Sequence, residues 1–186
     1  MQKLFYLAWV PVVLLGISLG ACGKKSTSLD SVSIQFGSKN KSLGLFQRHV
    51  NGDGRTEKGE VDGQTCERLI FKEGRISAYL YLNAVDAFKS RPLPPLTVTV
   101  EYFDAAPANF FLEYDTQIEG NGGGAYTASK ERILTKGLQE WQKATFHLDR
   151  PWLAGRQNDY ADFRIRVERS HDTPFCIRSV TLAKVK

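Results

Sequence analysis

The sequence predicts an all-β fold, an antiparallel β-sandwich in one domain. Apolar and polar residues alternate with period two along most of the chain, and helical periodicity is almost absent. Glycine- or proline-containing turn signals separate the alternating stretches. About eight to ten short strands, each with one apolar and one polar face, are typical of two packed antiparallel sheets. The clearest turn signals are Asn51–Gly54, Asp62-Gly63, Arg91–Pro95 and Gly120–Gly124.

Four stretches alternate most clearly and predict the central strands. They are Ile76–Asn83, Leu96–Tyr102, Phe110–Asp115 and Ala161–Glu168. In the first, we expect Ile76, Ala78, Leu80 and Leu82 on the core side, and Ser77, Tyr79, Tyr81 and Asn83 on the other.

Shorter strands and one irregularity complete the predicted elements. The shorter candidates are Ser31–Phe36, Leu43–Val50, Cys66–Phe71 and Trp141–Leu148. The last strand changes phase between Ile177 and Val180, which predicts a β-bulge near Arg178-Ser179. A single helical turn is expected at Ala84–Phe88 or at Pro151–Ala154.

The N-terminal segment resembles a bacterial lipoprotein signal peptide. Lys3 precedes an apolar run, and Leu19-Gly20-Ala21-Cys22 resembles the lipobox in which the cysteine is acylated. This predicts removal of residues 1–21, a lipid on Cys22 and a membrane-anchored protein that faces the periplasm or the cell surface. The outer membrane is favoured, because residue 23 is not the aspartate that resembles an inner-membrane retention signal. The alternative is a plain N-terminal membrane anchor, since the run is nearly long enough to span.

The predicted domain organisation follows from this cleavage. Residues 22–39 are expected to hold the lipidated cysteine, a polar tether and the first strand, and residues 40–186 the β-sandwich. The mature chain would have 165 residues, enough for one domain with a core. Its basic residues are scattered and exceed the acidic ones by only four, so we expect no nucleic-acid partner.

Two cysteines besides Cys22 predict a disulfide. Cys66 and Cys176 form an even pair in a protein expected to be exported, and an oxidising compartment favours a bridge between them. The bridge would close a loop of about 110 residues and contribute about 3–5 kcal/mol on a chain-entropy estimate. The alternative is two buried free thiols.

Three short motifs suggest chemistry, but their context favours other interpretations. Gly16–Gly20 matches a nucleophile-elbow pattern but lies inside the predicted signal peptide. Gly120–Ala125 loosely matches a dinucleotide fingerprint, without the strand and helix that such a site needs. His49–Arg55 with Glu60 resembles a calcium loop, yet its first position is a histidine, so we expect a tight glycine turn. The sequence therefore predicts no metal and no cofactor.

Catalytic spacing is weak as well. The histidines 49, 147 and 171 are dispersed, which argues against a zinc site. Two carboxylates at a suitable separation could cleave a glycosidic bond, and the candidates are Glu101, Glu113, Asp115 and Asp162. Solvated sheet faces always hold such residues, so we expect a protein that is not an enzyme.

Several stretches together resemble a known module. They are Leu43–Leu45 with Asp53–Thr56, Val98–Asp104, Phe111–Asp115, and Trp141–Phe146 with Arg156–Asn158, Ala161–Ile165 and Ile177–Val180. In this order they resemble a jelly-roll module found attached to bacterial secreted glycoside hydrolases, similar in fold to carbohydrate-binding modules. The resemblance covers residues 40–186 and implies a jelly roll that binds carbohydrate, here in a lipoprotein.

The leading functional hypothesis is non-catalytic binding of a glycan or polysaccharide. Sugar rings have apolar faces and hydroxyls, so their sites combine aromatic platforms with planar hydrogen-bonding groups. The predicted ligand-binding residues on the polar strand faces are Tyr79, Tyr81, Glu113, Asp115, Asp162 and Arg164. A second candidate region is the Trp152–Tyr160 loop. The alternatives are a structural or assembly lipoprotein that docks a partner protein, and a small polysaccharide-cleaving enzyme.

Overall fold

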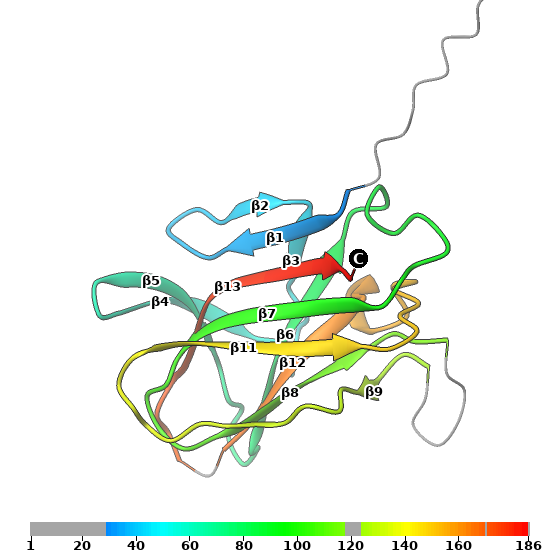
Figure 1. The fold of residues 1–186 in the computed structure, drawn as a ribbon. Coiled ribbons are helices and arrows are strands. Elements are labelled where there is room, and N and C mark those ends of the chain that lie inside the picture. The colour runs from blue at the N-terminus through cyan, green and yellow to red at the C-terminus, as the bar shows by residue number, and fades with distance from the viewer. Residues whose placement is uncertain (1–28, 118–123, 170, 186) are drawn as a thin grey trace, which may run out of the picture.

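The computed structural model describes residues 29–117, 124–169 and 171–185, and they form two packed antiparallel sheets (Figure 1). The strands are β1 Ser31–Gln35, β2 Lys41–Leu43, β3 Leu45–Arg48, β4 Thr56–Val61, β5 Gln64–Leu69, β6 Ser77–Ala84, β7 Leu96–Phe103, β8 Asn109–Tyr114, β9 Thr127–Ala128, β10 Ile133–Leu134, β11 Trp141–Leu148, β12 Phe163–Glu168 and β13 Phe175–Lys184. One short 3₁₀ turn, η1, spans Asn158–Tyr160. Across these ranges we find no helix with the length and apolar character to cross a membrane.

The strand order confirms the predicted sandwich. The first sheet has the order β11-β7-β13-β1-β2, with β5 beside β13 and β4 beside β5. The second has the order β10-β8-β12-β6-β3, with β9 beside β8. From β6 onward the long strands β6, β7, β8, β11, β12 and β13 alternate between the two sheets, which is the connectivity of a jelly roll.

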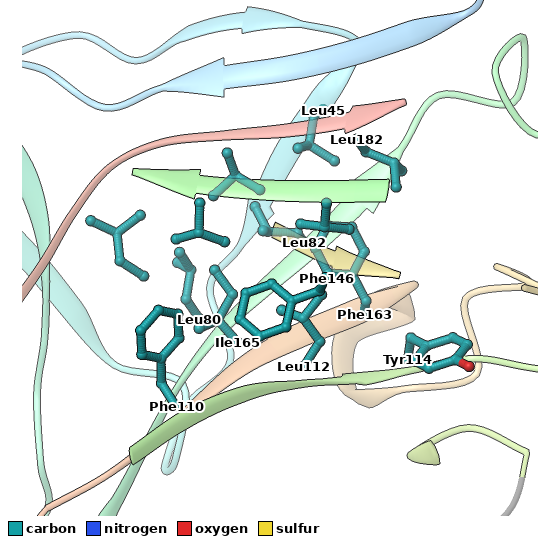
Figure 2. Packing of buried hydrophobic residues seen from close by; sticks show 14 of the residues in the cluster. Leu45, Leu80, Leu82, Phe110, Leu112, Tyr114, Phe146, Phe163, Ile165 and Leu182 are labelled. Carbon is teal, nitrogen blue, oxygen red and sulfur yellow. The ribbon is translucent and has the colours of Figure 1, made fainter. Parts of the chain in front are cut away.

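The core lies between the sheets, where the predicted alternation places it (Figure 2). Leu80 and Leu82 from β6 meet Leu112 of β8, Phe146 of β11 and Ile165 of β12, and all five are fully buried. Burying one such side chain contributes about 1.5–3 kcal/mol.

The assignment of Ile76 to the core side was wrong. Ile76 is 65% exposed because it precedes β6, on the turn that leads into the strand.

Glycine explains where one predicted strand divides. The stretch Leu43–Val50 splits at Gly44, so that β2 joins the first sheet and β3 the second. Gly44 has φ +81°, and a Cβ there would lie 2.9 Å from Val32 Cγ1. Only glycine allows the chain to change sheets this close to β1.

Other local predictions are confirmed. The pairing of β13 with β7 shifts between Ile177 and Ser179, the position of the predicted bulge. Asp62 and Gly63, both with positive φ, join β4 to β5 as the two-residue turn of a hairpin. Sequence reasoning missed β4, because its charged residues have no apolar face.

The helical turn expected at Ala84–Phe88 or at Pro151–Ala154 does not form. Residues 86–88 make a non-helical turn in which the Phe88 N–H donates to the Val85 carbonyl, and the 3₁₀ turn of the described residues lies at Asn158–Tyr160.

The segment before residue 40 contributes to the sandwich. β1 pairs along its length with β13, and its Val32 and Ile34 are buried in the core. The sandwich therefore includes the strand that we expected at the end of the tether.

Cys66 and Cys176 are neighbours on β5 and β13. Cys176 pairs with Arg68, so Cys66 lies diagonally across from it on the same face. Both are buried and unbridged in the structure, and they pack in one small cluster with Phe103. The neighbouring Cys176 thiol and burial raise the pKa of Cys66, whereas Cys66 and Arg68 lower the pKa of Cys176.

The disulfide stays a prediction, and this proximity makes it testable. Diagonal neighbours on paired strands are generally about 7–8 Å apart, near the upper end of the Cα separations that a disulfide spans. We expect non-reducing peptide mapping of the exported protein to find the two cysteines joined. Cys176→Ser should then lower the free energy of unfolding by about 2–5 kcal/mol. Free thiols at both positions would contradict the prediction.

Candidate functional site

The candidate site is the outer face of the second sheet, formed by β3, β6, β12 and β8. Because side chains alternate along each strand, the apolar core set leaves polar and aromatic residues on the opposite side. The register aligns Tyr81 with Arg164, and Arg164 with Glu113, in one row across the sheet. The next row aligns Tyr79 with Arg166. The structure thus brings together four of the six predicted ligand-binding residues: Tyr79, Tyr81, Glu113 and Arg164.

These four residues and Tyr126 form a tight group, which we call the Arg164 cluster. Arg164 Nε donates to Glu113 Oε2 at 2.5 Å, and its Nη1 donates to the Tyr81 hydroxyl. The guanidinium carbon lies 4.1 Å from the ring centre of Tyr79 and 4.4 Å from that of Tyr126. The Arg164 side chain is only 12% exposed. These contacts fix the guanidinium, and through it the Tyr79 ring, in one position.

Tyr81 lies beneath the surface, inside the Arg164 cluster. Its ring is fully buried, and a Cβ on Gly54 would lie only 2.7 Å from it. Its hydroxyl donates to Asp53 Oδ2 at 3.1 Å and accepts from Asn158 Nδ2 at 3.3 Å. Burial raises the pKa of Tyr81 above its ordinary value. The turn at residues 51–54 therefore covers this ring, and Tyr81 supports the face from below.

Asp115 and Asp162, the other two predicted ligand-binding residues, are fully buried. Asp115 accepts hydrogen bonds from the Ala154 N–H at 2.8 Å and from Arg156 Nε at 2.8 Å. Asp162 accepts from the Gly155 N–H at 3.0 Å. Both carboxylates therefore hold the loop that precedes β12.

Asp162 also ties this loop to the end of β6. It accepts from the Ala84 N–H at 2.9 Å and forms an ion pair with Lys89 Nζ at 3.2 Å. Burial raises the pKa of Asp162 to about 6, against the opposing effect of Lys89.

A hollow of about 470 Å³ opens beside the Arg164 cluster. We call it the Tyr79 hollow, and its lining includes Asp53, Lys72, Arg75, Ile76, Tyr79 and Arg166. Arg166 forms ion pairs with Glu113 at 3.2 Å and Glu168 at 2.6 Å. Lys72 and Arg75 are exposed and form no ion pair within the residues that the structure describes.

Sequence reasoning missed the cations of this hollow. Lys72 and Arg75 belong to the turn before β6, where no alternation indicates which way a side chain points. The available signal was the basic, glycine-containing run Lys72–Arg75 directly before a strand with an aromatic polar face.

The carboxylates considered for hydrolysis have structural partners. Glu101 lies on the first sheet, where it accepts from Ser179 Oγ at 3.0 Å, and Glu113 is held by Arg164 and Arg166. Asp115 and Asp162 hold the loop. None of these four lines the Tyr79 hollow, whose acidic residue in the described part of the chain is Asp53.

The metal and nucleotide motifs also have structural outcomes. Residues 51–53 form a tight turn closed by a bridge between Val50 and Gly54, and Glu60 lies in β4. Within the described ranges, no three His, Cys, Asp or Glu side chains converge as metal ligands would. Three of the sequence features, namely residues 120–123 of the glycine run, the Gly16–Gly20 motif and Cys22, lie outside the described residues.

Comparison with known proteins gives structural likenesses only. No family model and no curated protein matches the sequence. The CBM22-1 xylan-binding domain of Paenibacillus barcinonensis Xyn10C is similar with a TM-score of 0.46 and 15% identity, over 84% of this chain and 93% of that domain. The family 29 carbohydrate-binding module CBM29_1 of Piromyces equi has a TM-score of 0.45 and 9% identity, over 83% and 92%. The K1 cleaved adhesin domain of Lys-gingipain from Porphyromonas gingivalis W83 has a TM-score of 0.45 and 16% identity, over 84% of this chain and 99% of that domain.

Two of these three structures are carbohydrate-binding modules, the class that the sequence resemblance indicated. Identities of 9–16% carry over no residue's role.

Proposed function

We propose that this protein binds carbohydrate without catalysis, at the Tyr79 hollow, and that it is an exported lipoprotein anchored through Cys22. The observation that carries the binding proposal is the fixed ring of Tyr79, which lines the hollow while Arg164 braces it at 4.1 Å. A rigid aromatic ring beside guanidinium and ammonium donors matches the apolar face and the hydroxyls of a sugar.

The hollow is suited to a small part of a polysaccharide. Its volume of about 470 Å³ falls within the range of ordinary ligand sites. Because the Arg164 cluster is hydrogen-bonded before any ligand arrives, little side-chain entropy is lost on binding.

The charges of the hollow favour sugars with an anionic group. The one carboxylate among the described lining residues, that of Asp53, lies 3.7 Å from Arg164. Arg166 is neutralised by Glu113 and Glu168, but Lys72 and Arg75 form no ion pair among the described residues. A uronate or sulfate group would add charge-assisted hydrogen bonds to these cations. Binding of an acidic polysaccharide should therefore weaken as salt rises, because exposed charges are screened.

Replacement of Tyr79 tests the site. We expect Tyr79→Ala to cost about 2 kcal/mol of binding free energy, roughly 30-fold in Kd, because the stacking surface is removed. Tyr79→Phe keeps the ring and should retain most of the affinity. Affinity is measured by titration calorimetry on the full chain in detergent, against the neutral and acidic polysaccharides that bind in a glycan screen.

The matched control is Thr145→Ala, an exposed change on the outer face of the first sheet. Equal affinities of wild type and Tyr79→Ala would place binding elsewhere. If the wild type binds no glycan, the docking of a partner protein takes the place of this proposal.

The lipid anchor has its own test. The support is the Leu19–Cys22 lipobox after an apolar run. We expect mass spectrometry of the membrane fraction to find an N-terminal Cys22 that carries acyl chains. A chain that still begins at Met1, with unmodified Cys22, would contradict the anchor.

A further inference from the structure

A second hollow, of about 460 Å³, lies at the other end of β6 on the same outer face. We call it the Tyr160 hollow, and its lining includes Phe46, Arg48, Asn83, Asp86, Lys89 and Tyr160. Asn83 follows Tyr79 and Tyr81 on the outward side of β6, and Phe46 pairs with it from β3. Tyr81, covered by the turn at residues 51–54, lies between the two hollows.

Two aromatic rings are exposed at this hollow. Tyr160 is 76% and Phe46 is 45% exposed. Two exposed rings from different elements around one depression form an apolar surface next to hydrogen-bonding groups, which is the combination that marks a binding site.

The backbone holds Tyr160 in this exposed position. Asp159 and Tyr160 have φ of 52° and 58°, the left-handed region that L residues rarely adopt. Asn83 Nδ2 donates to the Tyr160 carbonyl at 2.8 Å. A Cβ on Gly155 would lie 3.0 Å from that same oxygen, so the loop is closely packed here.

Asp115 and Asp162, whose carboxylates are completely buried, fix the loop that leads to Tyr160. They bind the N–H groups of Ala154 and Gly155, a few residues before the tyrosine. Two buried carboxylates and the left-handed backbone of Asp159 and Tyr160 therefore hold the Tyr160 ring in its exposed position. Such rigidity serves binding, because the ring is already oriented before a ligand arrives.

The polar groups of the Tyr160 hollow are balanced in charge. Lys89 is paired with Asp162 at 3.2 Å and with Asp86 at 3.5 Å, and Arg48 Nη2 donates to Asn83 Oδ1 at 3.4 Å. Arg48 Nε is buried and has no acceptor among the residues that the structure describes. Unlike the Tyr79 hollow, this one has donors and acceptors for hydroxyls without a surplus of cations.

We propose that the Tyr160 hollow is a second saccharide subsite, in which Phe46 and Tyr160 contact a neutral pyranose ring. This inference rests on the proposed carbohydrate binding but concerns a separate place on the face. Tyr79 and Asn83 are four residues apart on one strand, about 13 Å. A polysaccharide that contacts both subsites gains avidity, because the second contact is intramolecular once the first has formed.

The experiment uses the full chain in detergent with two probe sets. The neutral probes are xylohexaose and cellohexaose, and the acidic probe is hexagalacturonate. Tyr160→Ala and Phe46→Ala each remove an exposed ring, and Leu134→Ala, 72% exposed on another strand, is the matched control. We expect either ring variant to weaken the binding of a neutral hexasaccharide at least tenfold. When Tyr79→Ala is added to either ring variant, it should weaken the binding of hexagalacturonate as much as it does in the wild type. Tyr160→Phe should retain affinity, which separates loss of the ring from a rearranged loop.

The outcomes separate this inference from the proposed function. If the ring variants leave all affinities within twofold while Tyr79→Ala weakens binding, the second subsite is refuted and the proposed function stands. If only the Tyr160 and Phe46 variants weaken binding, the second subsite stands and the Tyr79 site is refuted. If the wild type binds no saccharide in the probe sets or in the glycan screen, both are refuted.

Discussion

Asp162→Ala is expected to lower the free energy of unfolding by about 3–5 kcal/mol at pH 7. The wild-type carboxylate is fully buried and accepts from the N–H groups of Ala84 and Gly155 while pairing with Lys89. Alanine leaves both N–H donors without their acceptor and leaves the largely buried Lys89 ammonium with only the exposed carboxylate of Asp86, and breaking a buried pair from one side is strongly destabilising. Urea unfolding at fixed pH measures the change.

Asp86→Ala is the matched control for this variant. Asp86 also pairs with Lys89, at 3.5 Å, but its side chain is fully exposed. Its loss should change stability by no more than about 0.5 kcal/mol, as for other exposed substitutions. If the free energy of unfolding falls equally little in both variants, Asp162 does not hold the loop.

The pH dependence of stability gives an independent check on Asp162. Burial raises its pKa from 3.8 to about 6, so the folded chain binds this proton more tightly than the unfolded chain does. Tighter binding of this proton therefore adds to the stability of the folded chain. This added stability is complete below about pH 4 and is lost as pH rises through about 6. The stability difference between wild type and Asp162→Asn should fall over this interval, because asparagine does not titrate. A difference that rises with pH would contradict the assignment.

Arg164→Ala is expected to cost about 3 kcal/mol of stability and to weaken glycan binding as well. The Arg164 and Glu113 side chains are 12% and 10% exposed, so removal of the cation leaves a nearly buried carboxylate. The loss falls at the low end of the range for buried pairs because Arg166 still reaches Glu113, at 3.2 Å. Binding weakens because the Tyr79 ring loses the guanidinium that fixes it at 4.1 Å.

A double-mutant cycle separates these effects. Glu113→Gln removes the charge that Arg164 neutralises, so the double variant should lose less stability than the sum of the two single losses. Calorimetric affinities of the folded variants report on Tyr79 separately. Strict additivity in stability, with unchanged affinity, would rule out the bracing role of Arg164.

Much of the fold was already determined by the sequence. Alternation placed Leu80, Leu112 and Ile165 in the core. Because side chains alternate between the two faces of a strand, the apolar face must be the one that packs against the core. The Asp62-Gly63 hairpin and the bulge near Ser179 were predicted because their backbone requirements are local. The same alternation correctly put Tyr79, Glu113 and Arg164 on one outer face.

The tertiary structure decided which of these outward residues a ligand can reach. Tyr81 alternates like Tyr79, yet the turn at residues 51–54 covers it, and the loop after Pro151 buries Asp115 and Asp162. The reason is physical: periodicity reports the face of a strand to which a side chain belongs. Whether a distant loop packs on that face depends on hydrogen bonds between segments far apart in sequence. For the same reason the sequence did not predict that Lys72 and Arg75 line the Tyr79 hollow, because both lie on a turn without periodicity.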